Sequence, residues 1–299
     1  MKRKKTVSIS RADRIFYFAT DLILCLMVLI VSYPLLYIVA ASFSDPQNVA
    51  AGRVFLWPVG FSLRGYEEVF RHSQVWVGYR NTVFYTAAGT SINVAMTMMA
   101  AFGLSKRNLP GRNLFTFLFT FTMMFGGGLV PFYLLLRDLK MLNTIWAMLI
   151  PGAVSVYNMI VARTFIQSNI PAELSEAASI DGCSDFRYFF EILLPLSKAI
   201  LAVLALFYAV GHWNSYFNAM IYLRDPSLFP LQIVLREILI LNQIDPSAML
   251  DPSQQERLEG MADLLKYSLI VVATVPIMCV YPFVQKYFIK GVMIGSLKG

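Results

Sequence analysis

Two stretches of this chain place aromatic rings beside amide side chains within otherwise apolar sequence. The residues concerned are Tyr157 and Asn158 in the first stretch and Trp213, Asn214, Tyr216 and Asn218 in the second. Aromatic faces can stack on a sugar ring, and amides donate to and accept from hydroxyl groups. Because polar residues within membrane spans often face a cavity, the two stretches predict a path for a polar solute. Hydrogen bonding between helices, or anchoring at the membrane surface, explains the same residues equally well.

Other residues that could support chemistry do not form a recognisable site. Gly126–Gly128 could cradle a phosphate, but a nucleotide-binding loop continues with Gly-Lys-Ser or Gly-Lys-Thr, which this sequence lacks. In a membrane helix these glycines favour close packing or a local kink over a substrate contact. His72 and His212 are isolated, and the cysteines are far apart with no metal-site spacing. We expect no catalytic residue, no metal site and no cofactor in this chain.

Composition places these residues in a membrane protein. The sequence is 57% hydrophobic and 14% charged, with a mean hydropathy of +0.60. A bilayer core is crossed by about 20 apolar residues in a helix, and several runs here reach that length without a charge. The net charge of +7 is then better explained by basic cytoplasmic flanks than by nucleic-acid binding. The sequence predicts an all-α, polytopic membrane protein.

Hydropathy and charge together predict six transmembrane helices with both termini in the cytoplasm. Lys and Arg gather beside the run ends assigned to the inside, whereas acids lean outward. The first run is too long for a secretory signal, so we expect it to be retained after a basic tail, 1–14. An external loop, 224–263, contains helical spacing from Leu231 to Leu241, and a second cytoplasmic tail covers 290–299. The membrane domain covers 15–289, with approximate spans at 15–43, 81–105, 114–136, 142–162, 192–223 and 264–285.

A polar segment, 169–195, separates the fourth and fifth predicted spans. Pro171 suits the first turn of a helix, and Glu173 favours the positive end of its dipole, so a short helix is expected over Ala172–Asp181. Gly182 then lies where a left-handed cap would end that helix. Ser184 and Asp185 can cap a second helix that runs toward Pro195.

One face of the first short helix carries Leu174, Ala177 and Ala178. Residues three and four positions apart lie on the same side of a helix, and two alanines let another surface approach the backbone closely. The segment therefore suggests a docking helix, although an ordinary solvated hairpin between two spans is the simpler alternative.

Within this segment, Glu176-Ala177-Ala178, Gly182, Ile192 and Leu194-Pro195 resemble, by type and spacing, the EAA loop of ATP-binding-cassette (ABC) importer permeases. Cys183 departs mildly from the small residues common there. The resemblance implies a cytoplasmic coupling helix that inserts into a groove of the ATPase subunit. It assigns ATPase coupling to Glu173, Glu176, Ala177, Ala178, Asp181 and Gly182.

Six spans with this loop between the fourth and fifth resemble the maltose-type carbohydrate permeases of ABC importers. Gly127–Tyr133, Tyr281–Phe288 and Gly291–Gly295 are similar to further family patterns, and the long external loop is similar to a Gram-positive branch grouped with a lipoprotein-type polysaccharide permease. The resemblance implies a bacterial plasma membrane protein that imports a carbohydrate. It also implies a heterodimer with a second permease, two ABC ATPase subunits that hold ATP and Mg, and an extracellular solute-binding lipoprotein.

Two other classes of membrane protein remain as alternatives. A secondary active transporter of a small polar solute would usually need intramembrane carboxylates, and Asp21 near an inner end is poorly placed for a proton relay. A membrane enzyme would need clustered His, Asp, Glu or Cys at membrane level.

Overall fold

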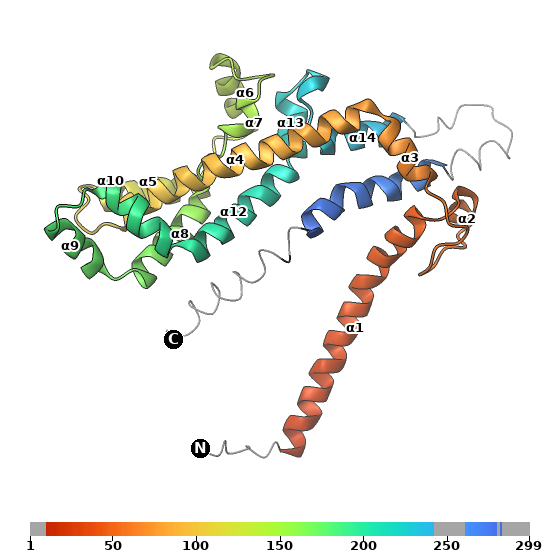
Figure 1. Cartoon of the computed structure of the whole chain (residues 1–299), viewed down its shortest axis with the longest axis horizontal. Coiled ribbons are helices and arrows are strands. Elements are labelled where there is room, and N and C mark those ends of the chain that lie inside the picture. Colours follow the sequence, from red (N-terminus) through yellow and green to blue (C-terminus); the bar gives the residue numbers. More distant parts are fainter. Residues whose placement is uncertain (1–9, 242–260, 280–281, 283–299) are drawn as a thin grey trace. The chain divides into compact units, whose positions relative to one another are not determined.

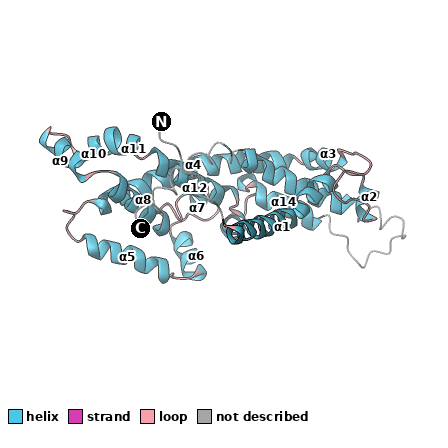
Figure 2. Ribbon diagram, turned by 90° about the horizontal axis from the view of Figure 1, so that it is seen from below, coloured by secondary structure: helices cyan, strands magenta, loops and turns pink. Residues whose placement is uncertain are grey.

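The computed structural model describes residues 10–241, 261–279 and Pro282, and every regular element in these ranges is helical (Figure 2). The predicted tails, apart from residues 10–14 of the first, and the family-like stretches 281–288 and 291–295, apart from Pro282, lie outside the described residues, as does 242–260 of the external loop. The chain divides into two compact units, one formed by Met1–Arg71 with Leu239–Val272 and the other by His72–Ile238 with Ala273–Gly299.

In the first unit, the first predicted span is the long helix α1, Arg11–Ser42. Its start is fixed by a capping box, in which Ser10 accepts a hydrogen bond from the helix and Asp13 accepts one from the Ser10 backbone. Most of its large apolar side chains are exposed, as expected of a helix whose surroundings are lipid or protein partners rather than water.

The end of α1 packs against short helices of the following loop. α2, Pro46–Ala50, and α3, Arg64–Arg71, follow. Their packing includes a 2.7 Å hydrogen bond between the hydroxyls of Ser42 and Tyr66. A Cβ on Gly65 would lie 2.2 Å from Oγ of Ser268 in the helix Met261–Cys279, so glycine permits this close approach.

The second unit is built around α4, Ser73–Ser105, against which α8, Val156–Asn169, and α12, Lys198–Trp213, pack (Figure 1). Side chains from all three helices meet in one apolar core, where Met98, Met159 and Leu204 are almost completely buried.

The helix α4 contains the whole predicted span 81–105 but begins earlier, at Ser73. Nothing between the two positions breaks a helix, and Gly78 packs against the following α14, Leu231–Leu241. A Cβ on Gly78 would lie 2.9 Å from Cα of Leu231, so this extension is stabilised by tertiary packing. The helical spacing predicted for α14 is confirmed.

The third predicted span is not one straight helix. α5, Arg112–Met124, ends before the three glycines, and α6, Leu129–Asp138, leaves it at a bend of 113° (Figure 1). Gly128 adopts φ 85° and ψ 169°, a conformation that side chains disfavour. Cβ atoms at Gly126 or Gly127 would meet nothing within 4 Å, so the glycines make a break rather than a close helix contact.

The fourth predicted span, 142–162, is also interrupted. A short helix, α7, Trp146–Leu149, is separated from α8 by Pro151 and by Gly152, whose φ is +76°. α8 then continues beyond the predicted end to Asn169. Proline and a left-handed glycine explain the interruption, because neither continues a regular helix.

The fifth predicted span is assembled from several pieces. α10, Asp185–Tyr188, continues as the π-helical η1, Phe189–Leu193, and the one-turn α11, Leu194–Leu196. The chain then bends by 84° into α12, and a break at Asn214 and Ser215 precedes α13, Tyr216–Tyr222. A 3₁₀ turn, η2, Pro226–Leu228, leads on toward α14.

Three helices within the described ranges are long and apolar enough to cross a membrane alone, α1, α4 and Met261–Cys279. Counting each bent pair, α5 with α6 and α10–α11 with α12, as one span raises the number to five. This number is one fewer than the six predicted spans because the fourth predicted span is split into α7 and α8. Irregular backbone of this kind is tolerated at membrane depth where protein groups satisfy its hydrogen bonds.

Candidate functional site

The predicted coupling helix is present as α9, Ala172–Ile180, one residue shorter than predicted (Figure 1). Gly182 follows it with φ +75°. The backbone N–H of Cys183 donates to the carbonyl of Ala178 at 2.8 Å, and that of Gly182 donates to Ser179 at 3.1 Å. These two bonds form the left-handed cap that the sequence predicted, and they fix where α9 ends.

α9 is attached to the protein through one face. Ala178 is buried in the same apolar core as Ile166, Ile170 and Tyr188. The side chains assigned to ATPase coupling other than Ala178, namely Glu173, Glu176, Ala177 and Asp181, are exposed, as is Gly182. The predicted face is thus divided, since Ala178 packs inward whereas Leu174 and Ala177 remain exposed.

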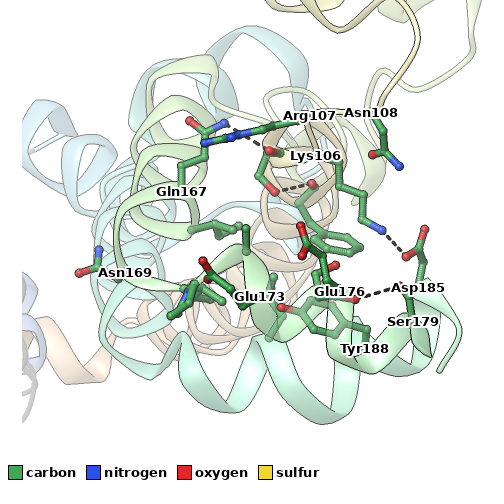
Figure 3. Close-up of a pocket in the computed structure, with 18 of the residues that line it drawn as sticks. Lys106, Arg107, Asn108, Gln167, Asn169, Glu173, Glu176, Ser179, Asp185 and Tyr188 are labelled. Carbon is green, nitrogen blue, oxygen red and sulfur yellow. Dashed lines mark hydrogen bonds and ion pairs between the residues drawn. The ribbon is translucent and has the colours of Figure 1, made fainter. Parts of the chain in front are cut away.

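A groove of about 1190 Å³ runs beside α9, between it, the turn after α4, the end of α8 and the start of α10. Figure 3 shows Glu173 and Glu176 on the α9 side, with Lys106 reaching from the α4 turn to an ion pair with Asp185. The amide of Gln167 donates to the carbonyl of Ser105 at 3.3 Å. These contacts join α4, α8 and α10 around the groove and leave the acidic side of α9 accessible.

The helix after α9 is capped as predicted. The backbone N–H of Arg187 donates to Oγ of Ser184 at 3.3 Å, and Nε of Arg187 lies 2.8 Å from a carboxylate oxygen of Glu191. The π-helical turn that follows was not predicted. Such turns often mark functional sites.

The two predicted substrate-path residues in the fourth run lie in the first turn of α8. Tyr157 is exposed, whereas Asn158 is 7% exposed and its backbone N–H donates to Oγ of the capping residue Ser155. Only Tyr157 therefore presents its side chain at the surface of this chain.

Trp213 and Asn214 lie at the end of α12, where both have structural partners. The indole N–H of Trp213 donates to the carbonyl of Ala273 at 3.0 Å, and its ring lies edge-on to Tyr79. The amide of the exposed Asn214 donates to the carbonyl of Val210 at 2.9 Å, which caps the helix. These contacts match the packing alternative that the sequence left open.

Tyr216 and Asn218 lie on α13. The hydroxyl of Tyr216 lies 2.9 Å from the sulfur of Met220, the Arg236 guanidinium lies 5.3 Å from its ring centroid, and Asn218 is exposed. None of the six substrate-path residues lines the groove beside α9 or the apolar pocket of about 410 Å³ between α4, η1 and α12. Their role in a substrate path stays a prediction.

Comparison with known proteins identifies the family of this chain. Residues 7–294 match the family described as the binding-protein-dependent transport system inner membrane component. The chain belongs to this family. The match covers nearly the whole chain, including α9 and both helices that flank the polar segment.

Relatives of this inner membrane component include two proteins of Bacillus subtilis. It is 40% identical over 279 residues to the polygalacturonan/rhamnogalacturonan transport system permease protein YtcP, covering 92% of this chain and 96% of the relative. It is also 40% identical over 294 residues to the protein LplC, covering 98% of each. A solved bacterial ABC transporter involved in import of the acidic polysaccharide alginate contains a similar chain, with a TM-score of 0.85 and 35% identity over 95% of this chain and 100% of that one.

The inner membrane component also contains polar contacts that the sequence analysis missed. Asn93 and Thr97 on α4 meet Tyr208 and His212 on α12, beside the break between α7 and α8. The available signal was a pair of polar residues four positions apart in each apolar run, a spacing that places each pair on one helix face.

Proposed function

We propose that this chain is the membrane-spanning permease subunit of an ABC importer that carries a carbohydrate, specifically a fragment of an acidic polysaccharide. The supporting observation is a family match over residues 7–294, together with relatives whose names specify polygalacturonan or alginate transport. Identity of 40% along almost the full chain supports a shared role more strongly than fold alone.

In this proposal α9 couples the permease to ATP hydrolysis. Its exposed acidic residues lie on a capped helix held to the core through Ala178, so an ATPase subunit can contact the helix without unfolding its attachment. The partners are a second permease, two ABC ATPase subunits that bind ATP and Mg, and a solute-binding lipoprotein outside. In the proposed arrangement, both termini and α9 lie on the cytoplasmic side of a bacterial plasma membrane.

Closure of the ATPase dimer would move α9, and α9 would pass that motion to α8 and α12. The pore then alternates between inward and outward access while the lipoprotein delivers the sugar. The chemistry of ATP hydrolysis belongs to the ATPase subunits, so this chain acts as a mechanical element rather than as an enzyme.

The test is an affinity pull-down of the full chain from its host in mild detergent, followed by mass spectrometry and an ATPase assay. Recovery of a second permease, a P-loop ATPase and a lipoprotein supports the proposal. A chain that purifies without an ATPase and moves solute with an ion gradient would instead identify a secondary transporter.

Charge reversal on α9 sharpens the same experiment. Glu176→Lys should lower ATPase recovery by about tenfold, because a charge reversed within an interface costs more than 1.4 kcal/mol. Glu67→Lys, the same change at an exposed glutamate of α3, is the matched control and should leave recovery unchanged. Equal recovery with both variants would remove Glu176 from the coupling surface.

A further inference from the structure

The break between α7 and α8 leaves backbone groups that no helix satisfies. Residues 150–155 contain Pro151 and the left-handed Gly152, so the regular pattern of hydrogen bonds stops there. In a membrane protein such groups need partners from neighbouring elements. Side chains of α4 and α12 supply them.

Asn93 supplies a hydrogen-bond partner to the backbone in the first part of the break. Its side-chain amide donates to the carbonyl of Gly152 at 2.7 Å, and its side-chain oxygen lies 2.9 Å from Nε2 of His212. Because an amide oxygen only accepts, His212 must donate through Nε2. Asn93 is 3% exposed, so these contacts are shielded by α4, α12 and the break itself.

Tyr208 supplies a hydrogen-bond partner to the backbone in the second part of the break. Its hydroxyl accepts a hydrogen bond from the backbone N–H of Ser155 at 3.0 Å and lies 2.6 Å from Oγ1 of Thr97. Ser155 is also the residue that caps α8 through its own side chain. The Tyr208 hydroxyl therefore ties the N-cap residue of α8 to both α4 and α12.

Gly89 makes room for this arrangement. A Cβ at Gly89 would lie 2.3 Å from Nε2 of His212, a distance that no side chain at this position could accommodate without moving the imidazole. Glycine thus lets the ring approach the backbone of α4 and reach Asn93. We call Asn93, Thr97, Tyr208 and His212, with the backbone groups that they bind, the α4–α12 polar network.

The α4–α12 polar network is connected to α9 through one continuous helix. α8 runs for 14 residues from its cap at Ser155 to Asn169, a length of about 21 Å, and α9 begins three residues later. At the lower end, Ile166 and Ile170 share the core that buries Ala178 of α9. α8 thus packs against the core that holds α9 at one end and against the Tyr208 hydroxyl at the other.

We propose that Tyr208 and Asn93 are positioning residues for transport, which fix the start of α8 to α4 and α12 so that motion of α9 displaces the three helices together. This inference rests on the proposed function, because it assigns the residues to transmission of ATPase motion. Without the network, the ATPase would still move α9. The start of α8 could then shift relative to α4 and α12, so the motion of α9 would not displace those two helices.

The test uses Tyr208→Phe in the complete transporter, with both permeases, the ATPases and the lipoprotein, reconstituted in proteoliposomes. Oligogalacturonate is the transported probe, and the measured quantity is solute accumulated per ATP hydrolysed. We expect Tyr208→Phe to lower this ratio at least threefold while the ATPase rate stays near that of the unmodified protein. Thr97→Val should lower the ratio in the same direction, and Thr97→Ser, which retains the hydroxyl, should preserve it.

Tyr85→Phe is the matched control. The Tyr85 hydroxyl, on α4, also forms a hydrogen bond with a distant backbone group, donating to the carbonyl of Leu228 at 2.9 Å, but it does not touch the break. An unchanged ratio in Tyr208→Phe, or equal losses in both tyrosine variants, would overturn the positioning role. Failure of the unmodified complex to accumulate the probe with ATP would instead count against the proposed function.

Discussion

Two breaks in this permease look alike in sequence and differ in structure. The break between α5 and α6 and the break between α7 and α8 each contain a left-handed glycine with a proline nearby. Around Gly126–Gly128, a Cβ at either of the first two glycines would meet nothing within 4 Å. Around Gly152, the backbone is held by Asn93 and by Tyr208.

The difference shows that glycine and proline determine where a membrane helix stops but not how firmly the break is held. Firmness comes from residues distant in sequence, which satisfy the freed backbone groups. The break between α5 and α6 can therefore adapt to whatever packs against it, whereas the one between α7 and α8 has a fixed geometry within this chain.

Asn93→Leu should weaken the held break most. Leucine has the same number and branching of side-chain heavy atoms as asparagine but removes the partners of the Gly152 carbonyl and of His212 Nε2. Two interhelical hydrogen bonds in a membrane protein contribute about 3 kcal/mol at the upper end of measured values, so the free energy of unfolding should fall by about that amount. The measurement is unfolding of the purified full chain by SDS titration in mixed micelles.

Asn113→Leu serves as its control, because Asn113 is exposed at the start of α5. It should change the free energy of unfolding by less than about 0.5 kcal/mol, as is usual for surface substitutions. Similar losses for Asn93→Leu and Asn113→Leu would mean that the network does not hold the break.

Gly89→Ala tests whether the close approach of the His212 ring to the backbone of α4 is required for the α4–α12 polar network. The added methyl group would collide with the imidazole of His212 and push it from Asn93, so we expect a loss of about 2 kcal/mol, typical of an overpacked site. Gly103→Ala lies in the same helix with nothing within 4 Å of the added Cβ. It should stabilise by about 0.5–1 kcal/mol through helix propensity alone. The same SDS titration measures both changes in the free energy of unfolding, which should have opposite signs. No change in Gly89→Ala would refute the close approach of His212 to α4.

Local signals in the sequence were enough to predict the two helices of the polar segment 169–195. Pro171, Gly182 and Ser184 set the start and end of α9 and the cap of α10 through contacts within a few residues. The helical spacing of Leu231–Leu241 predicted α14 for the same reason.

Contacts between distant residues were beyond such reasoning. Asn93 and His212 are separated by 119 positions, and the early start of α4 depends on the fit of Gly78 against Leu231. The aromatic ring of Trp213 suggested a substrate contact, but its hydrogen bond to Ala273 appears only when α12 is packed. Side-chain type predicts the chemistry that a residue could perform, whereas its neighbours in space determine whether that chemistry remains available.

Gly128→Ala should produce the smallest loss, at the open break. Gly128 has φ 85° and ψ 169°, a conformation that costs an L side chain about 1 kcal/mol at the low end, but the added methyl group would touch only Pro131, at 3.9 Å. Gly127→Ala is the control, since its φ is not positive and its surroundings are open, and it should be close to neutral. Both are measured by SDS titration against the unmodified chain. A loss at Gly127 as large as that of Asn93→Leu would show that the first break is held as tightly as the second, and the contrast between them would then be wrong.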